Sequence, residues 1–316
     1  METPKTLIEA VTFFNEPKNA IKYLASRRWP TGVTCPYCET ENPMFLETRL
    51  IWKCRRCHKQ FSVKVGTIFE DSAIALGKWL VVTWQLVNCK NGVSSYEIAK
   101  AIGVTQKTAW FMLQRIRKAM QDDRRGGKLS GEVEVDESYI GGKARNMHKS
   151  HKLKTLEGKG GGSVGKTAVQ GMLQRGGEVR LRVIENTQYH NVVPAVHDNV
   201  EAGSHLFTDE VVAYFGLRAE YAHQVINHAE TYVNGQIHTN GMENFWSLLK
   251  RGLHGTYISV EPFHLFRYLD EQALRFNLRK LTDSERFAFV CSHVTGRRLT
   301  WNEMTAKTTP TEIERW

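Results

Sequence analysis

The sequence predicts a mixed α/β domain preceded by two small modules, a β ribbon that contains four cysteines and an α-helical module. Three observations support this fold class. Two Cys-x-x-Cys pairs lie close together near the amino end, a helical pattern of apolar residues follows from residue 72 to 120, and strand-like runs mixed with helical segments begin after residue 130. The chain of 316 residues is long enough for about two domains.

The composition is that of a folded protein with a basic surface. Hydrophobic residues make up 41%, and 43 Lys and Arg against 33 Asp and Glu give a formal charge of +10. This imbalance favours a polyanionic partner, either nucleic acid or an anionic membrane surface. The amino end lacks the pattern of a signal peptide, and the most apolar run, residues 79–87, is too short to span a bilayer. We therefore expect an intracellular protein.

A short helical lead-in ends in RRWPTG, and the spacing of the next cysteines is typical of a zinc ribbon. CPYC and CRRC form a C-x2-C-x15-C-x2-C pattern. The ligands would be Cys35, Cys38, Cys54 and Cys57. Two such pairs supply four thiolates to a tetrahedral Zn²⁺ and, in a reducing compartment, bind metal more often than they form disulfides. A redox pair or two chance pairs are the alternatives. Cys89 and Cys291 are isolated, and we expect both to be buried.

The segment SSYEIAKAIGVTQKTAWFMLQRIRKAM predicts a helix-turn-helix. Ile98 and Ile102 give a short apolar face, Gly103 permits the tight turn, and apolar residues from Ala109 to Ile116 give the core face of a second helix. Residues at the start of that helix could read base edges, and basic residues farther along could meet phosphates. These candidates are Gln106, Lys107, Thr108, Arg115, Arg117 and Lys118. The alternative is a helical hairpin with a solvated basic face, but the ribbon and the overall charge favour DNA.

A polar, glycine-containing linker follows, and after it apolar and polar residues alternate as in β-strands. GEVEVDESYIGG reads as a half-buried strand, and Gly176-Gly177 predicts a hairpin between TAVQGMLQR and EVRLRVI. Residues 194–200 read as part of a helix, and SHLFTDE as a short strand. Residues 240–249 and 262–278 look helical and are followed by a polar tail. The order of strands, helix, strand and helices predicts a mixed α/β domain.

GKGGGSVGKT, residues 158–167, has the spacing of a phosphate-binding nucleotide loop. Such a loop follows a buried apolar strand and opens a helix. Here the upstream segment is basic without an apolar run, and the downstream segment leads into the Gly-Gly hairpin. We therefore expect no ATP binding, and interpret the segment as a basic glycine-rich loop whose lysines, Lys166 among them, could hold a phosphate backbone. A disordered solvated loop is the alternative.

Three acidic residues lie at the ends of predicted elements. Asp136 and Asp209 end strands, and Glu243 lies near the start of the last helices, the type of position where open α/β sheets build sites. Gathered carboxylates repel one another unless a cation lies between them, and Mg²⁺ takes oxygen ligands. Singly, each could instead be a turn residue, a helix cap or a surface acid. Glu132, Glu134 and Asp136 share one parity, so a regular strand lines up three acids unless a bulge or an exposed edge separates them.

The motifs VDESYIGGK, TDE and HTNGMENFWSLLKRGLHGTY, with the ribbon and the helix-turn-helix before them, closely resemble bacterial insertion-sequence transposases of the ISXO-two-like branch. The resemblance covers nearly the whole chain. It implies a ribonuclease-H-like catalytic domain whose D-D-E triad is Asp136, Asp209 and Glu243, and Mg²⁺ or Mn²⁺ as catalytic ions. It also implies that Lys250, seven residues after Glu243, touches DNA near the cleaved end.

Many relatives carry Asn in place of the third acid, and this chain has Asn240 and Asn244 beside Glu243. Glu243 is preferred because it keeps the spacing to Lys250 and because a carboxylate binds Mg²⁺ better than an amide. Aromatic residues nearby, Phe245 and Trp246 among them, are expected in the core rather than stacked on bases. The histidines near Glu243 are read as structural, and among them His238 is the one to test.

Together these observations predict a DNA transposase that binds the ends of an insertion sequence, with divalent-metal-dependent DNA cleavage and strand transfer. The expected parts are a helical lead-in at 1–31, the zinc ribbon at 32–68, the helix-turn-helix at 72–125, the catalytic domain at 131–292 and a tail at 293–316. The expected partners are double-stranded DNA, as element ends and target, and further copies of the chain; no membrane is expected. The expected location is the bacterial cytoplasm, at the nucleoid. The alternative is a catalytically inactive, transposase-derived DNA-binding regulator.

Overall fold

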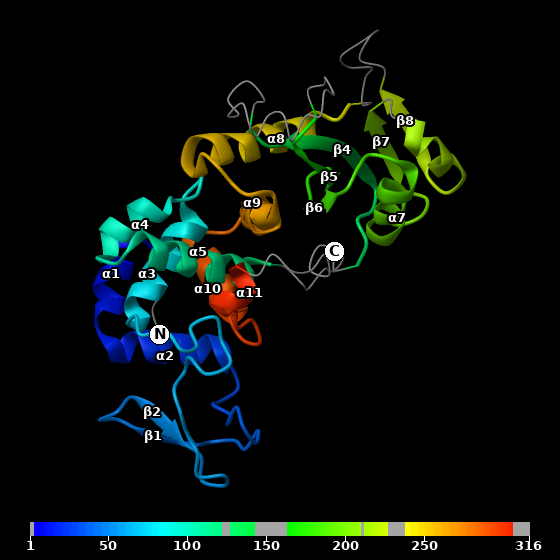
Figure 1. The fold of residues 1–316 in the computed structure, drawn as a ribbon. Helices are drawn as coiled ribbons and strands as arrows, with labels where there is room; N and C mark the ends of the chain where they lie inside the picture. The colour runs from blue at the N-terminus through cyan, green and yellow to red at the C-terminus, as the bar shows by residue number, and fades with distance from the viewer. Residues whose placement is uncertain (1–2, 122–126, 143–162, 210–211, 227–237, 306–316) are drawn as a thin grey trace. The chain divides into compact units, whose positions relative to one another are not determined.

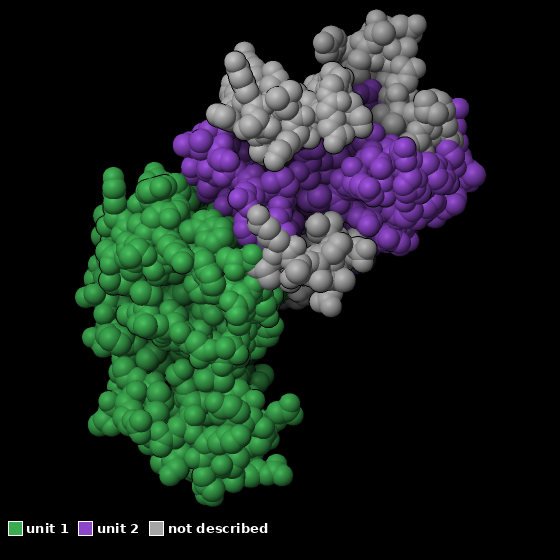
Figure 2. Space-filling view, viewed as in Figure 1, with its two compact units in different colours: residues 1–122, 278–307 green, residues 123–277, 308–316 purple. Residues whose placement is uncertain are grey.

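The computed structural model describes residues 3–121, 127–142, 163–209, 212–226 and 238–305. The chain divides into two compact units (Figure 2). Unit 1 comprises residues 1–122 and 278–307, and unit 2 comprises residues 123–277 and 308–316. In the described ranges, none of the helices has the length and apolar character needed to cross a membrane.

Unit 1 is helical, with a small three-stranded antiparallel sheet in the order β1-β2-β3. Its strands are β1 (Met44–Leu46), β2 (Ile51–Lys53) and β3 (Gln60–Phe61). Its helices are α1 (Leu7–Asn15), α2 (Pro17–Arg28), α3 (Leu76–Asn88), α4 (Ser95–Ile102), α5 (Gln106–Met120), α10 (Asp283–Ser292) and α11 (Trp301–Thr305). Aromatic rings form much of the helical core: Phe287 lies 5.5 Å from Tyr23 and 5.1 Å from Trp84, centroid to centroid.

The helix-turn-helix is present as α4 and α5. Ser94 and Glu97 form a capping box at the start of α4, so two backbone N–H groups that a helix end leaves unpaired are satisfied. Gly103 ends α4 at φ 66°, a left-handed conformation that glycine adopts at little cost, and the Thr105 side chain caps α5. Local sequence signals therefore set both ends of the turn.

The carboxyl-terminal segment differs from the expectation that the catalytic domain runs to residue 292 and a tail follows. The structure assigns residues 278–307 to unit 1. The reason is hydrophobic burial: α10 packs on α2 and α3, and its Phe287, Val290 and Cys291 are fully buried. We expected a polar tail here because the surrounding residues are mostly polar.

Unit 2 is built on a five-stranded sheet in the order β6-β5-β4-β7-β8 (Figure 1). Strands β4, β7 and β8 are parallel to one another, and β5 lies between β4 and β6 and pairs antiparallel with both. The strands are β4 (Glu132–Ile140), β5 (Thr167–Gln174), β6 (Val179–Ile184), β7 (His205–Asp209) and β8 (Ala222–Ile226). The helices are α7 (Tyr189–Asn199), α8 (Asn240–Gly252) and α9 (Leu265–Asn277), with 3-10 turns η2 (Val212–Ala219) and η4 (Pro262–His264) and a π-helical turn η3 (Leu253–Tyr257).

The two faces of this sheet carry separate cores because side chains alternate along each strand. Val133 and Val135 of β4 pack with α7 and Tyr214 on one face. Val169 and Leu173 of β5 pack with α8 and α9 on the other face. A mixed sheet covered by helices on both faces agrees with the ribonuclease-H-like fold that we expected. Asp136 has the parity of the second face, so it lies under α8.

Candidate functional site

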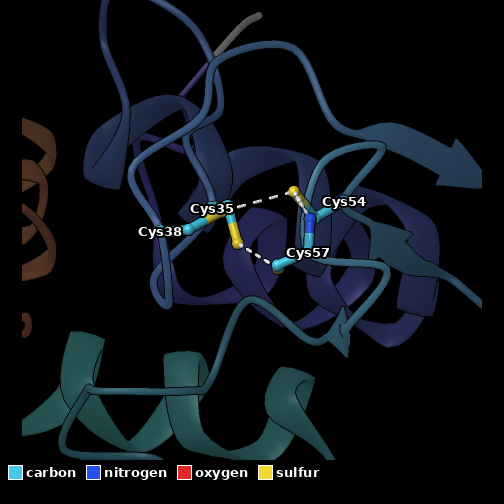
Figure 3. A group of neighbouring side chains, drawn as sticks. All are labelled: Cys35, Cys38, Cys54 and Cys57. Carbon is cyan, nitrogen blue, oxygen red and sulfur yellow. Dashed lines mark hydrogen bonds between the residues drawn. The ribbon is translucent and has the colours of Figure 1, made fainter.

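The four cysteines of the ribbon point toward one another, as Figure 3 shows. Their Sγ atoms all lie within 4.8 Å of one another, with 3.7 Å between Cys35 and Cys57 and 3.5 Å between Cys38 and Cys54. Sulfur atoms around a tetrahedral Zn²⁺ with Zn–S bonds of about 2.3 Å lie about 3.8 Å apart. The Thr40 hydroxyl, 3.3 Å from the Cys38 sulfur, lowers the pKa of that thiol to about 6, which favours the thiolate that a metal requires. The site fits Zn²⁺.

The two aspartates of the expected triad lie on neighbouring parallel strands: Asp209 ends β7, whereas Asp136 lies in the middle of β4 and not at a strand end as we expected. The pairing of β4 with β7 aligns Val135 with Thr208, so Asp136 and Asp209 are the next residues on adjacent strands. Glu243 lies in the first turn of α8, the helix that packs on β4, and its side chain is exposed. Burial raises the pKa of Asp136, and the negative charges of Asp209 and Glu243 raise it further. Asp136 thus lies within electrostatic reach of both Asp209 and Glu243.

The acidic cluster of Asp136, Asp209 and Glu243 is more open than the cysteine site. Among the described residues, only the four cysteines gather three or more potential ligand atoms within 4.8 Å. The repulsion that raises the pKa of Asp136 is the electrostatic cost that bound cations would remove.

Two hydrogen bonds hold the Asp136 carboxylate. The indole Nε1 of Trp246 donates to Oδ2 at 3.0 Å, and the backbone N–H of Glu137 donates to Oδ1 at 2.8 Å. We expected Trp246 to be a core residue. It is indeed 4% exposed, yet it also orients a triad residue, a role that helical spacing alone could not reveal.

The three acids of β4 do share one face, and no bulge separates them, since β4 pairs with β5 without interruption from Val133 to Ile140. Instead, Arg175 neutralises two of them. Its Nε lies 2.9 Å from Glu134 Oε1, and its Nη1 lies 3.3 Å from Glu132 Oε2. Glu134 is 1% exposed and also accepts the backbone N–H of Met242 at 2.9 Å. The sequence interpretation did not identify Arg175. The available signal was its position directly before the hairpin glycines, at the end of the strand that pairs with β4.

Glu137 points to the opposite face of the sheet. The Tyr214 hydroxyl donates to its carboxylate and, at 2.8 Å, accepts from the side-chain amide of Gln170. Burial raises the pKa of Glu137 to about 7, with a further contribution from the charges of Asp136 and Asp209. Glu137 is therefore a fourth carboxyl group, on the face of the sheet opposite Asp136.

His238 lies close to the same network, with Nδ1 3.5 Å from Glu134 Oε1 and 3.3 Å from Arg175 Nη2. It neighbours the residues that support the cluster. His223 accepts or donates a 2.8 Å hydrogen bond at Thr208, the residue before Asp209. Both histidines are thus engaged in hydrogen bonds around the cluster.

Two of the expected phosphate contacts on α5 are contradicted by burial. Arg115 is 4% exposed and donates to the backbone carbonyls of Leu299 and Glu70 at 2.8 and 2.9 Å, and Arg117 is fully buried. Both expectations were wrong because burial keeps the two guanidinium groups away from a DNA backbone, and that of Arg115 is held by the carbonyls of Glu70 and Leu299. Cys89 is also exposed rather than buried, because it lies just beyond the end of α3.

The remaining candidates on α5 are accessible to different degrees. Lys107 is exposed, with its ammonium 4.4 Å from the centroid of the Trp301 ring. Gln106 donates to the Ser95 hydroxyl at 2.8 Å, and the Thr108 hydroxyl lies 2.9 Å from that of the capping Thr105. The start of α5 thus retains polar groups at its surface. Lys118 is half-buried.

In unit 2, Lys250 is exposed on α8, and Lys166 is half-buried just before β5. Thr167 opens β5 rather than a helix, so the glycine-rich segment lacks the helix that a nucleotide-binding loop requires. Residues 143–162, which include the first half of that segment, lie outside the described residues.

Comparisons with known proteins point to mobile genetic elements. A family model described as an ISXO2-like transposase domain matches residues 128–277, and one described as a transposase zinc-ribbon domain matches residues 18–60. A protein of Halobacterium salinarum, described as an uncharacterized protein in transposable element ISH50, is 28% identical over 275 residues, which is 84% of this chain and 92% of that protein. A transposase-like protein of Haemophilus influenzae is 31% identical over 96 residues, 30% of this chain and 77% of that protein.

Proposed function

Because the chain belongs to the ISXO2-like transposase family, we propose that it is a DNA transposase that cleaves the ends of an insertion sequence and joins them to target DNA. The observation that carries this proposal is the placement of Asp136 and Asp209 on adjacent parallel strands, beside the helix α8 whose first turn contains Glu243. Carboxylates arranged in this way are suited to phosphodiester chemistry with divalent cations.

The triad residues would hold Mg²⁺ or Mn²⁺, which when bound supply activation of the attacking oxygen and stabilisation of the leaving oxygen. Trp246 and the backbone N–H of Glu137 keep the Asp136 carboxylate oriented toward α8. Lys250, exposed on the same helix as Glu243, supplies a positive charge for a DNA phosphate. The reaction is hydrolysis that leaves a 3′-hydroxyl, followed by attack of that hydroxyl on target DNA at the same site.

DNA recognition is assigned to the ribbon and the helix-turn-helix. The zinc-ribbon match and the formal charge of +10 support this assignment. The exposed Lys107, with Gln106 and Thr108 beside it, is the part of α5 best suited to reach base edges, and Lys118 and Lys166 serve the backbone. Two element ends must be held together, so the protein acts as a homo-oligomer on DNA at the bacterial nucleoid.

The test uses the zinc-loaded full chain, Mg²⁺ or Mn²⁺, and a supercoiled plasmid that carries the DNA flanking the gene. The expected result is metal-dependent cleavage at the flanks, with joined products, which disappears in Asp209→Ala. Asp198→Ala is the matched control, since Asp198 is an exposed aspartate of α7. Specific binding of the flanks without cleavage in either metal would refute the catalytic proposal and favour an inactive DNA-binding regulator.

A further inference from the structure

Arg175 contacts every segment that carries a residue of the acidic cluster. It follows β5 and precedes the turn at Gly176, and its backbone N–H donates to the Glu132 carbonyl at 2.9 Å. Its side chain is 17% exposed, so the guanidinium lies mostly inside unit 2. From this place the guanidinium reaches β4, β7 and the start of α8.

The contact with β4 is an ion pair. Nε of Arg175 lies 2.9 Å from the buried Glu134, which is two residues before Asp136. Glu134 is 1% exposed, and a carboxylate removed from water in this way requires a positive partner. Arg175 supplies that partner for Glu134 and so fixes the Glu134 side chain in this part of the strand.

The contact with β7 is made through an aromatic ring. The guanidinium carbon lies 4.0 Å from the centroid of Phe207, which is two residues before Asp209 and faces the same side of the sheet. This distance is suited to stacking of the planar guanidinium, which an ammonium group does not reproduce. The position of Phe207 relative to β4 is thereby tied to that of Glu134.

The contact with α8 is made from both ends of the same ion pair. Nη2 of Arg175 donates to the His238 carbonyl at 2.7 Å, just before the helix. Glu134 accepts the backbone N–H of Met242 at 2.9 Å, one residue before Glu243. A carboxylate at this end of a helix is favoured by the helix dipole.

The first turn of α8 packs closely against this ion pair. A Cβ atom at Gly241 would lie 2.6 Å from Leu173 Cδ2 and 2.7 Å from Glu134 Oε2. The first turn of α8 therefore rests directly on the Glu134 carboxylate, and a displacement of that carboxylate moves the turn that carries Glu243.

We propose that Arg175 is a positioning residue that sets the relative placement of Asp136, Asp209 and Glu243 for divalent cations. The proposal rests on the proposed function for the use of those cations. It assigns Arg175 no contact with DNA or with the reacting phosphate. Its effect passes through Glu134, Phe207 and the start of α8.

The test measures Mn²⁺ binding by the zinc-loaded full chain without DNA, by electron paramagnetic resonance titration. Arg175→Lys keeps the charge but loses the planar fork, and we expect Mn²⁺ binding to weaken about ten- to a hundredfold, as for other residues that orient metal ligands. Arg182→Lys is the matched control, since Arg182 is a half-buried arginine of β6, and it should bind Mn²⁺ as the wild type does. Asp209→Ala identifies the binding that belongs to the acidic cluster.

A second variant covers the case in which Arg175→Lys does not fold. Glu134→Gln retains the shape and an acceptor for the Met242 N–H but loses the ion pair, and it too should weaken Mn²⁺ binding. Unchanged Mn²⁺ affinity in a folded Arg175→Lys or Glu134→Gln protein overturns the proposal, as does a wild type that binds no more Mn²⁺ than Asp209→Ala. If Mn²⁺ binding by the wild type depends on Arg175 as expected but the protein cleaves no DNA, the proposed function fails while the positioning role remains.

Discussion

Gly171 is the position where the smallest substitution should separate α8 from the sheet. A Cβ atom there would lie 2.2 Å from Met242 Cε and 2.8 Å from Trp246 Cζ2. The end of a methionine side chain can move aside, but the indole is held by its hydrogen bond to Asp136. Gly171→Ala therefore forces the indole to shift away from β5.

The cost follows from that geometry. Overpacking of a buried site destabilises a protein by about 1–3 kcal/mol, and in a domain of this size each kcal/mol lowers the melting temperature by about 2–4 °C. Moving the Trp246 indole also weakens its 3.0 Å bond to the Asp136 carboxylate, a kind of bond worth about 1.5–3 kcal/mol. We expect Gly171→Ala to melt several degrees lower and, at a temperature where it is folded, to cleave DNA at least about tenfold more slowly.

The assay pairs thermal melting with metal-dependent cleavage of a plasmid carrying the flanking DNA. Gly142→Ala is the control, because among the described residues a Cβ atom at Gly142 meets no atom within 4 Å beyond its chain neighbours. Gly171→Ala that melts and cleaves like the wild type would show that α8 does not rest on β5 as described. A loss of stability with normal cleavage by the folded protein would show that the Trp246 bond to Asp136 does not serve the reaction.

Three further predictions concern the other sites. Cys35→Ser should lose the bound zinc, measured by metal analysis of the purified protein; retention of one equivalent would contradict the four-cysteine site. Burial raises the pKa of Glu137 to about 7, so the free energy of unfolding should fall as pH rises from about 4.5 to 7. Urea unfolding of Glu137→Gln should show this fall reduced by up to about 3 kcal/mol. The same fall in Glu137→Gln as in the wild type would refute the shift. Lys250→Ala should weaken binding of cleaved ends and reduce its salt dependence without changing the melting temperature, because the side chain is exposed; salt dependence like that of the wild type would argue against a phosphate contact.

The sequence by itself determined the features that depend on short spacings. The cysteine pattern predicted a metal site whose sulfur atoms the structure gathers within 4.8 Å. The turn at Gly103 and the hairpin at Gly176 were readable because local backbone geometry limits which residues fit there. The parity of β4 correctly placed Glu132, Glu134 and Asp136 on one face, since side chains alternate along a regular strand.

Only the tertiary structure decided which charged residues are buried and what they touch. Arg115 looked like a phosphate contact on its helix, but its partners include the carbonyl of Leu299, 184 positions away in the sequence. No sequence pattern marked Arg175, yet it contacts Glu134, 41 positions away in the sequence, and the His238 carbonyl, 63 positions away. Periodicity reports the environment along one element, whereas the partner of a buried charge is set by elements that folding brings together from distant parts of the chain.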